Sequence, residues 1–243
     1  MPGNKELTMI IQGKNAVYEA IKGGTTIERL CVQKGMGGLD RVVDAAKKAN
    51  IKVVFSEKQY MAKLSPDGRH QGVLAVATDF RYADMEDILS APSPRLVLVL
   101  DGIEDPHNLG AVVRVADCAG ASGVIIPKYR ASGVTDTVVK VSAGASAHVK
   151  IAKVTNVNEA IRRLKDEGFT AVAADMDGKP MYDCDMRGDL AVVIGSEGHG
   201  VHALTKKLCD GTVSIPQFGQ VNSLNASVAA GIVVYEAVRQ RRK

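Results

Sequence analysis

The sequence predicts two α/β units, the second of them built on a parallel sheet that helices cover on both faces. Two observations predict this fold class. Segments with the apolar pattern of strands alternate with helix-like segments along almost the whole chain. In the second unit the strand segments are nearly continuous apolar runs, such as LVLVLD and LAVVIG, which is typical of parallel strands buried on both faces.

The first unit is expected over residues 1–80 as a small α/β sandwich. Its strands are expected at 27–33, 51–55 and 72–78, and its helices at 13–22, 39–50 and 57–64. The pattern weakens over residues 81–95, where DMEDILSAPSPR is acidic and contains two prolines. A linker with a short helix at 85–89 is therefore expected there.

The second unit is expected over residues 96–243. Its strands are expected at 96–101, 123–127, 169–175, 190–195 and 213–216, and its helices at 107–120, 157–168 and 201–210; residues 134–151 are expected to be helical and then extended. The chain then continues into the almost uncharged run VAAGIVVYEAV. This run predicts a C-terminal helix that is buried on most of its faces.

The composition is that of a soluble globular protein, with 46% hydrophobic and 24% charged residues. No apolar run approaches the ~18 residues that a membrane span needs, and the first residues lack the apolar segment of an export signal. The four cysteines lie far apart without a CxxC motif, which favours free thiols in a reducing cytoplasm. His199 and His202 lack the HExxH pattern and clustered carboxylates, so no metal site is expected.

The positive charge is confined to the first unit. Residues 1–80 carry 12 Lys and Arg against 8 Asp and Glu, whereas residues 81–243 carry 19 of each. An excess of this size is compatible with a polyanionic partner, although lysines on solvated helix faces explain it equally simply.

Three loops are expected at the carboxyl edge of the second sheet, where ligands of parallel α/β sheets bind. They are residues 101–110, which precede Arg114, the glycine-rich 195–200, and 215–225. GSEGHG is neither GxGxxG nor a Walker A loop, which argues against a dehydrogenase or a simple NTPase. Each loop alone has an ordinary structural explanation, such as a glycine turn, a capped helix or an Arg114–Asp117 ion pair.

Taken together, the three loops resemble the three motifs of the SpoU (TrmH-like) family of RNA 2′-O-methyltransferases, in the right order. The matching stretches are LDGIEDPHNLGAVVRVADCAGASGVIIP, LAVVIGSEGHGV and VSIPQFGQVNSLNASVAAGIVVYEAVRQRR. The first unit, with QGKNAVYEAI and HQGVLAVAT, resembles the L30e-like substrate-binding domain of many members. The resemblance is closest to the bacterial 23S rRNA guanosine 2′-O-methyltransferases.

This resemblance implies a SPOUT-type catalytic domain over residues 96–243, with a trefoil knot in its C-terminal segment. It implies S-adenosylmethionine as cofactor, RNA as substrate, with 23S rRNA expected, and a cytoplasmic homodimer with the C-terminal helix in its interface. A tRNA ribose 2′-O-methyltransferase and a catalytically idle L30e-like RNA-binding protein remain the alternatives.

Matching the motifs residue by residue assigns two sets of site residues. The catalytic set is Asn108, Arg114, Glu197, Ser223 and Asn225. The cofactor-binding set is Ile194, Gly195, Glu197, Ile215, Ser223 and Leu224. Because a guanidinium stays protonated, Arg114 is expected to steer a phosphate and stabilise the developing alkoxide, with Asn108 and Glu197 holding it in place.

Overall fold

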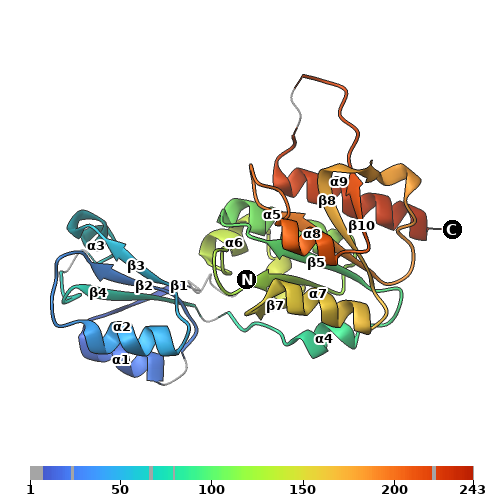
Figure 1. The fold of residues 1–243 in the computed structure, drawn as a ribbon. Coiled ribbons are helices and arrows are strands. Elements are labelled where there is room, and N and C mark those ends of the chain that lie inside the picture. Colours follow the sequence, from blue (N-terminus) through green and yellow to red (C-terminus); the bar gives the residue numbers. More distant parts are fainter. Residues whose placement is uncertain (1–7, 23–24, 66–67, 79, 221–222, 243) are drawn as a thin grey trace. The chain divides into compact units, whose positions relative to one another are not determined.

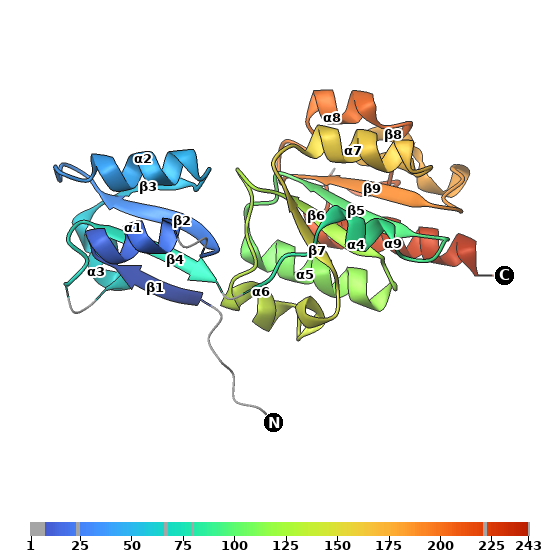
Figure 2. The ribbon, with the colours of Figure 1, turned by 90° about the horizontal axis from the view of Figure 1, so that it is seen from below.

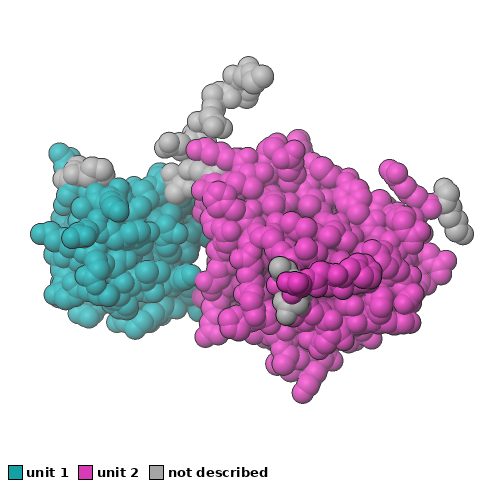
Figure 3. Space-filling view, turned by 90° about the horizontal axis from the view of Figure 1, so that it is seen from above, with its two compact units in different colours: residues 1–81 teal, residues 82–243 magenta. Residues whose placement is uncertain are grey.

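The computed structural model describes residues 8–22, 25–65, 68–78, 80–220 and 223–242. The chain divides into two compact units, residues 1–81 and residues 82–243 (Figure 3). Each unit has its own sheet and its own hydrophobic core.

The first unit is a four-stranded mixed sheet with helices on both faces (Figure 1). Its elements are β1 (Thr8–Gln12), α1 (Lys14–Lys22), β2 (Ile27–Gln33), α2 (Asp40–Lys48), β3 (Val53–Ser56), α3 (Lys58–Leu64) and β4 (Val73–Thr78). The strand order is β1-β4-β2-β3, and only β2 and β3 run parallel. Val17 of α1 and Val42 of α2 are buried against one face of the sheet, and Met61 of α3 is buried against the other.

Strand β1 is missing from the strands expected in this unit. Its five residues, TMIIQ, pair antiparallel with β4 at the edge of the sheet. An edge strand has one paired neighbour, so a short apolar run after a polar N-terminal stretch suffices to form it. The pairing partner β4 lies about 65 residues further along the chain, and no local pattern indicates it.

The second unit alternates strands and helices. Its elements are α4 (Met85–Leu89), β5 (Leu96–Asp101), α5 (Pro106–Cys118), β6 (Gly123–Pro127), α6 (Asp136–Val141), the 3-10 turn η1 (Ala145–Ala147), β7 (Ile151–Val154), α7 (Val157–Asp166), β8 (Thr170–Pro180), the 3-10 turn η2 (Met181–Asp183), β9 (Leu190–Gly195), α8 (Ala203–Leu208), β10 (Gly211–Ser214) and α9 (Ala226–Arg241). The six strands form one parallel sheet in the order β10-β8-β9-β5-β6-β7, which confirms the predicted α/β class.

Helices cover both faces of this sheet (Figure 2). Helices α7 and α8 lie on one face, and α5, α6 and α9 lie on the other. The apolar strands β5 and β9 lie at the centre, and every one of their residues is buried. Because both strands end at the same edge, the loops after Asp101 and after Gly195 emerge side by side.

Residues 82–95, which the sequence analysis treats as a linker, lie within the second compact unit. Helix α4 occupies the expected residues, and its Ile88 is buried in the core between β5 and α7. Strand β8 is also longer than expected, because it continues past Asp175 to Pro180; its register with β10 shifts between Ala173 and Lys179.

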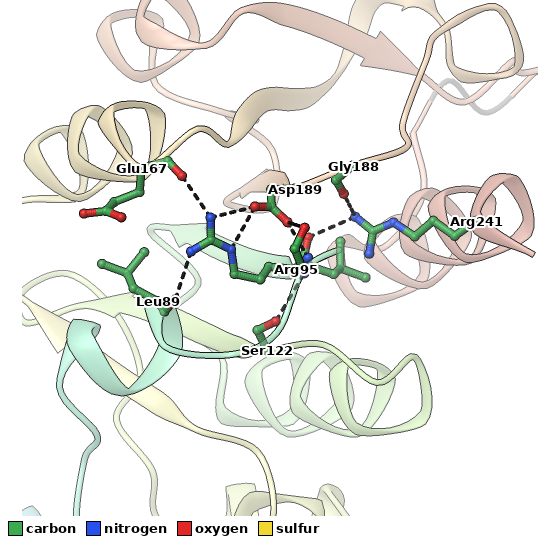
Figure 4. Close-up of polar contacts among 9 residues, drawn as sticks. Leu89, Arg95, Ser122, Glu167, Gly188, Asp189 and Arg241 are labelled. Atoms are coloured by element: carbon green, nitrogen blue, oxygen red, sulfur yellow. Dashed lines mark hydrogen bonds and ion pairs between the residues drawn. The ribbon is translucent and has the colours of Figure 1, made fainter.

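A polar cluster ties the start of β5 to the start of β9 and the end of α9 (Figure 4). The guanidinium of Arg95 donates from Nε and Nη2 to Asp189 Oδ2 at 2.9 and 2.6 Å, and both side chains are 13% exposed. Arg95 also donates to the backbone carbonyls of Leu89 and Glu167, and Arg241 donates to those of Arg95 and Gly188. The charge-assisted pair therefore joins the starts of β5 and β9, and the hydrogen bonds of Arg241 join the end of α9 to both.

Candidate active site

A tight turn after β9 forms the centre of the site. The backbone N–H groups of Ser196 and Gly200 each donate to the other residue's carbonyl, at 3.1 and 3.0 Å. A Cβ on Gly195 would lie 1.9 Å from the carbonyl carbon of Gly200, so the closed turn requires glycine at position 195. The turn carries Glu197 out beyond the carboxyl edge of the sheet.

Two helix N-termini meet this turn. Helix α5 begins with Asp105 as its N-cap, whose carboxylate accepts from the backbone N–H of His107, and Pro106 at the first position. This start places Asn108 in the first turn of α5, where it is buried. Helix α9 begins with Asn225 as its N-cap, whose Oδ1 accepts from the backbone N–H groups of Ser227 and Val228.

Asn108, Glu197 and Asn225 form a closed triangle of hydrogen bonds. Asn108 Nδ2 donates to Glu197 Oε1 at 2.8 Å. Asn225 Nδ2 donates to the same oxygen at 2.6 Å and to Asn108 Oδ1 at 2.9 Å. One predicted site residue from each of the three motifs therefore contributes to a single polar network, which fixes the turn and both helix starts.

A cavity of about 560 Å³ lies on one side of this triangle. All six residues of the predicted cofactor-binding set line it: Ile194, Gly195, Glu197, Ile215, Ser223 and Leu224. Asn225 lines it as well, and the small side chains of Ala174, Ala226 and Ala229 complete the wall. The volume is in the usual range for ligand pockets, and the mixture of apolar walls with a few polar groups is typical of them.

The wall of this first cavity carries negative charge that the sequence analysis did not assign. Asp175, within the part of β8 where its register with β10 shifts, lines the cavity and pairs with Lys206 Nζ at 2.8 Å. Burial opposes ionisation of Asp175, but hydrogen bonds from Lys206 and the backbone N–H of Met176 outweigh it and hold its pKa below the ordinary value. The first cavity therefore presents the carboxylates of Asp175 and Glu197, which suits a ligand with positive charge.

A second cavity of about 590 Å³ adjoins the first. The two cavities share the residues Ser196, Glu197 and Ala226 in their walls. The second is lined in addition by Asn108 and by charged and polar residues from three loops: Glu104, Asp105, Arg130, His199 and His202. A ligand in each cavity would meet the other at the wall that carries Glu197.

A carboxylate–imidazole pair at the second cavity is absent from the predicted site. Asp101, the last residue of β5, is buried, and its Oδ2 lies 3.0 Å from both the backbone nitrogen and Nδ1 of His202. The one signal in the sequence is the acidic residue that ends the apolar run LVLVLD at the ligand-binding edge. The partner lies 101 residues later, so the pair itself appears only in the fold.

Arg114 lies apart from the triangle. It is exposed on α5, and among the described residues its guanidinium makes no hydrogen bond or ion pair. The expectation that Asn108 and Glu197 hold Arg114 is wrong for this chain, because those two side chains bond to each other and to Asn225. The Arg114–Asp117 ion pair is also not formed between these described residues.

Two further observations concern metal binding and membrane-spanning helices. The described residues contain no group of three His, Cys, Asp or Glu that could hold a metal ion. Over the same part of the chain, no helix has the length and apolar character to cross a membrane.

Comparisons with known proteins agree with the arrangement of the two units. The SpoU rRNA Methylase family matches residues 95–235, and the domain described as RNA 2′-O ribose methyltransferase substrate binding matches residues 10–83. A Staphylococcus haemolyticus protein named for the TrmH family of tRNA/rRNA methyltransferases is 41% identical over 97% of both chains. A Bacillus subtilis protein of the same family name, YacO, is 39% identical over 94% of both.

Solved structures share the fold. The SpoU methyltransferase AviRb from Streptomyces viridochromogenes, crystallised with AdoMet, aligns with a TM-score of 0.63 at 24% identity, over 96% of this chain and 90% of that one. A TrmH/SpoU tRNA modifying enzyme from A. aeolicus aligns with a TM-score of 0.56 at 28% identity, over 64% and 80%.

The chain belongs to the SpoU rRNA methylase family. This membership confirms the predicted family and the predicted enzyme class, an RNA methyltransferase.

Proposed function

We propose that S-adenosylmethionine binds in the first cavity and that the acceptor ribose of the RNA enters the second. The observation that carries this proposal is the shared wall, because it brings both ligands to Glu197 and the triangle. The cofactor supplies a methyl group on a positively charged sulfur, which an oxygen nucleophile can attack. The carboxylates of Glu197 and Asp175 suit that positive charge, and the apolar walls at Ile194, Ile215 and Leu224 suit an adenine ring.

The triangle positions both sides of the reaction. Asn108 and Asn225 hold the carboxylate of Glu197 through Nδ2 donors, and Asn225 also fixes the start of α9. Ser223 and Leu224 line the first cavity immediately before this cap. A site whose groups are already hydrogen-bonded in place spends little free energy on ordering them when substrate binds.

Arg114 is proposed to bind the phosphate next to the target ribose and to stabilise charge on the 2′-oxygen. Its exposed guanidinium is free for a bidentate contact with phosphate oxygens. Since the triangle does not hold Arg114, the RNA itself is expected to order it.

The proposed substrate is ribosomal RNA, with a guanosine of 23S rRNA as the target nucleotide; a tRNA ribose is the alternative. Residues 1–80 are proposed to bind the RNA, and residues 96–243 to bind the cofactor and carry out the transfer. The proposal includes the trefoil knot in the C-terminal segment, which the resemblance to the family implies. We place the enzyme in the cytoplasm because its four cysteines are free.

Alkaline hydrolysis of the reacted RNA tests the reaction. Alkali cleaves RNA through the free 2′-hydroxyl, so a 2′-O-methylated linkage leaves one missing band in the hydrolysis ladder. Purified 23S rRNA and total tRNA are reacted separately, and the gap is located in each. An unbroken ladder with labelled methyl recovered on a free base contradicts the reaction; a gap in tRNA alone selects the alternative substrate. RNA-binding without methyl transfer selects the idle RNA-binding protein.

A homodimer that covers the outer face of α9 is part of the proposal. The helix buries Ala230, Val233 and Ala237 within the unit, but Val228 and Tyr235 on its other face are 49% and 48% exposed. Within one chain, α9 is therefore buried on one face, not on most of its faces as expected. In the proposed dimer a second copy of the chain would cover the exposed face. Light scattering at micromolar concentration is expected to give twice the chain mass, and a monomeric mass contradicts the proposal.

A further inference from the structure

The turn after β9 is bound at its exit by a carboxylate on each side. In the sheet, β9 lies between β8 and β5. Asp101, the last residue of β5, accepts a hydrogen bond from the backbone N–H of His202 at 3.0 Å. On the other side, Asp175 of β8 accepts one from the backbone N–H of Val201. Two consecutive N–H groups after the 195–200 turn therefore bond to carboxylates of the two neighbouring strands.

Asp175 also lies next to the residue that closes this turn. A Cβ built on Gly200 would lie 2.9 Å from Asp175 Oδ2, so the carboxylate is in close contact with this glycine. The backbone N–H of Gly200 donates to the carbonyl of Ser196 at 3.0 Å, and its carbonyl accepts from the N–H of Ser196 at 3.1 Å. Asp175, Ser196 and Gly200 all line the first cavity. A displacement of the carboxylate would therefore change the wall of that cavity.

Lys206 fixes the position of this carboxylate. Its Nζ lies 2.8 Å from Asp175 Oδ2, and Oδ1 of the same carboxylate accepts from the backbone N–H of Met176 at 2.7 Å. The side chains of Lys206 and Asp175 are only 25% and 14% exposed, so water screens their attraction weakly. A second carboxylate, that of Asp177, lies 2.9 Å from the same Nζ. Because Lys206 belongs to α8, the ion pair joins β8 to the helix that follows the turn.

We propose that Asp175, held by Lys206, is a positioning residue that keeps the 195–200 turn closed and so sets the affinity of the first cavity for S-adenosylmethionine. The inference rests on the proposed function of that cavity. Asp175 acts on the turn and takes no part in the transfer step. A wall that is already ordered before the ligand arrives costs less free energy to order on binding, which strengthens the binding.

Calorimetry on the full-length protein tests the proposal with two probes, S-adenosylmethionine and S-adenosylhomocysteine, whose sulfur is neutral. Lys206→Met and Asp175→Asn are each expected to weaken the binding of both probes about tenfold, because each breaks the ion pair. Lys206→Arg keeps a cation beside Asp175 and should bind both probes more tightly than Lys206→Met. Lys207→Met, which removes an exposed lysine of the same helix, is the matched control and should bind like the wild type.

The Lys206→Met variant separates positioning from charge. If Asp175 acted by its charge alone, removal of the neighbouring cation would strengthen its attraction for a positively charged sulfur. Tighter binding of S-adenosylmethionine by Lys206→Met, or an unchanged affinity for both probes, therefore overturns the proposal.

Hydrogen exchange followed by NMR tests the turn without any ligand. The amide of Gly200, which donates to Ser196, is expected to exchange faster in Lys206→Met than in the wild type at the same pH and temperature. The amides of the central strand β5 report global unfolding, so a change at Gly200 that they do not share identifies opening of the turn. Unchanged exchange at Gly200 overturns the positioning role. Failure of the wild type to bind either probe would instead overturn the proposed function of the cavity.

Discussion

At the scale of single residues, a substitution of Arg114 tests whether this residue contributes to the rate of methyl transfer without contributing to the assembly of the site. Arg114→Ala is expected to lower the methyl-transfer rate about 10²–10³-fold, the usual loss when one group that stabilises developing charge is removed. The fold and the cofactor affinity should be unchanged, because the exposed guanidinium contacts neither the triangle nor the walls of the first cavity. Single-turnover kinetics and calorimetry measure the two effects.

The lysine variant tests how Arg114 acts. Arg114→Lys is expected to remain at least about tenfold slow, because an ammonium cannot reproduce the planar fork of a guanidinium on phosphate. A lysine enzyme with the wild-type rate would reduce Arg114 to a source of general positive charge.

The sequence predicts more of the first cavity than of the second. Motif matching predicts six cofactor-binding residues, and all six line one cavity. It also names Asn108, Glu197 and Asn225, but not the hydrogen bonds that join them, which depend on the meeting of two helix starts and a turn. Asp101 and His202 lie 101 residues apart and belong to no local pattern, so only the pairing of β5 with β9 brings them together.

At the scale of elements, Asn225 caps α9 through Oδ1 and holds the triangle through Nδ2. Asn225→Ser keeps a good N-cap but removes the amide donors, whereas Asn225→Ala removes both. The alanine variant is expected to be about 1 kcal/mol less stable than the serine variant, which should unfold near the wild-type denaturant midpoint. Both are expected to lose activity, since both remove one of the two amide donors that hold Glu197. Urea unfolding and single-turnover rates distinguish the roles; equal stability of the two variants contradicts the capping role.

The local sequence pattern predicts the helices and strands that are buried or amphipathic. It fails where a strand depends on pairing with another strand that is distant in the sequence. The central strands β5 and β9 and the helices α7 and α9 lie close to their expected positions. Strand β1 forms because β4 offers a free edge, and β8 continues past its apolar residues because β10 pairs with its far end. In both cases the stabilising hydrogen bonds come from tertiary pairing, which composition does not encode.

At the scale of the whole molecule, the Arg95–Asp189 pair makes stability depend on pH (Figure 4). Burial opposes the charge on Asp189, but hydrogen bonds from Arg95 and Ser93 outweigh it and hold its pKa below the ordinary value. A depressed carboxyl pKa contributes stability that is complete above the unfolded value near ~4 and is lost as the pH falls through the folded value. The free energy of unfolding is therefore expected to decrease below about pH 4.

Asp189→Asn isolates this pair. It leaves Arg95 buried without its counter-charge, so it is expected to cost roughly 3 kcal/mol near neutral pH and to flatten the acid limb of the stability curve. Asp166→Asn is the matched control, because Asp166 is exposed at the end of α7 and its side chain makes no ion pair or hydrogen bond with the described residues. Denaturant unfolding between pH 2.5 and 7 measures both variants, and an acid limb that Asp189→Asn leaves unchanged contradicts the assignment.

The last prediction is that the first unit supplies the affinity for RNA. The whole excess of positive charge lies in residues 1–80. Binding through phosphates releases counterions, so the affinity for RNA should fall with salt, with a slope of about −0.7 per neutralised phosphate on single strands. Deleting residues 1–80 is expected to weaken RNA binding and flatten that slope while calorimetry gives an unchanged cofactor affinity.

Two charge-matched variants of the full chain, Lys47→Gln/Lys48→Gln on α2 and Lys58→Gln/Lys63→Gln on α3, remove two exposed lysines from opposite faces of the first sheet. The variant on the RNA-contacting face should reduce the slope by up to about 1.4, and the other should leave it nearly unchanged. Tight, equally salt-dependent RNA binding by the truncated protein contradicts the assignment of RNA affinity to the first unit.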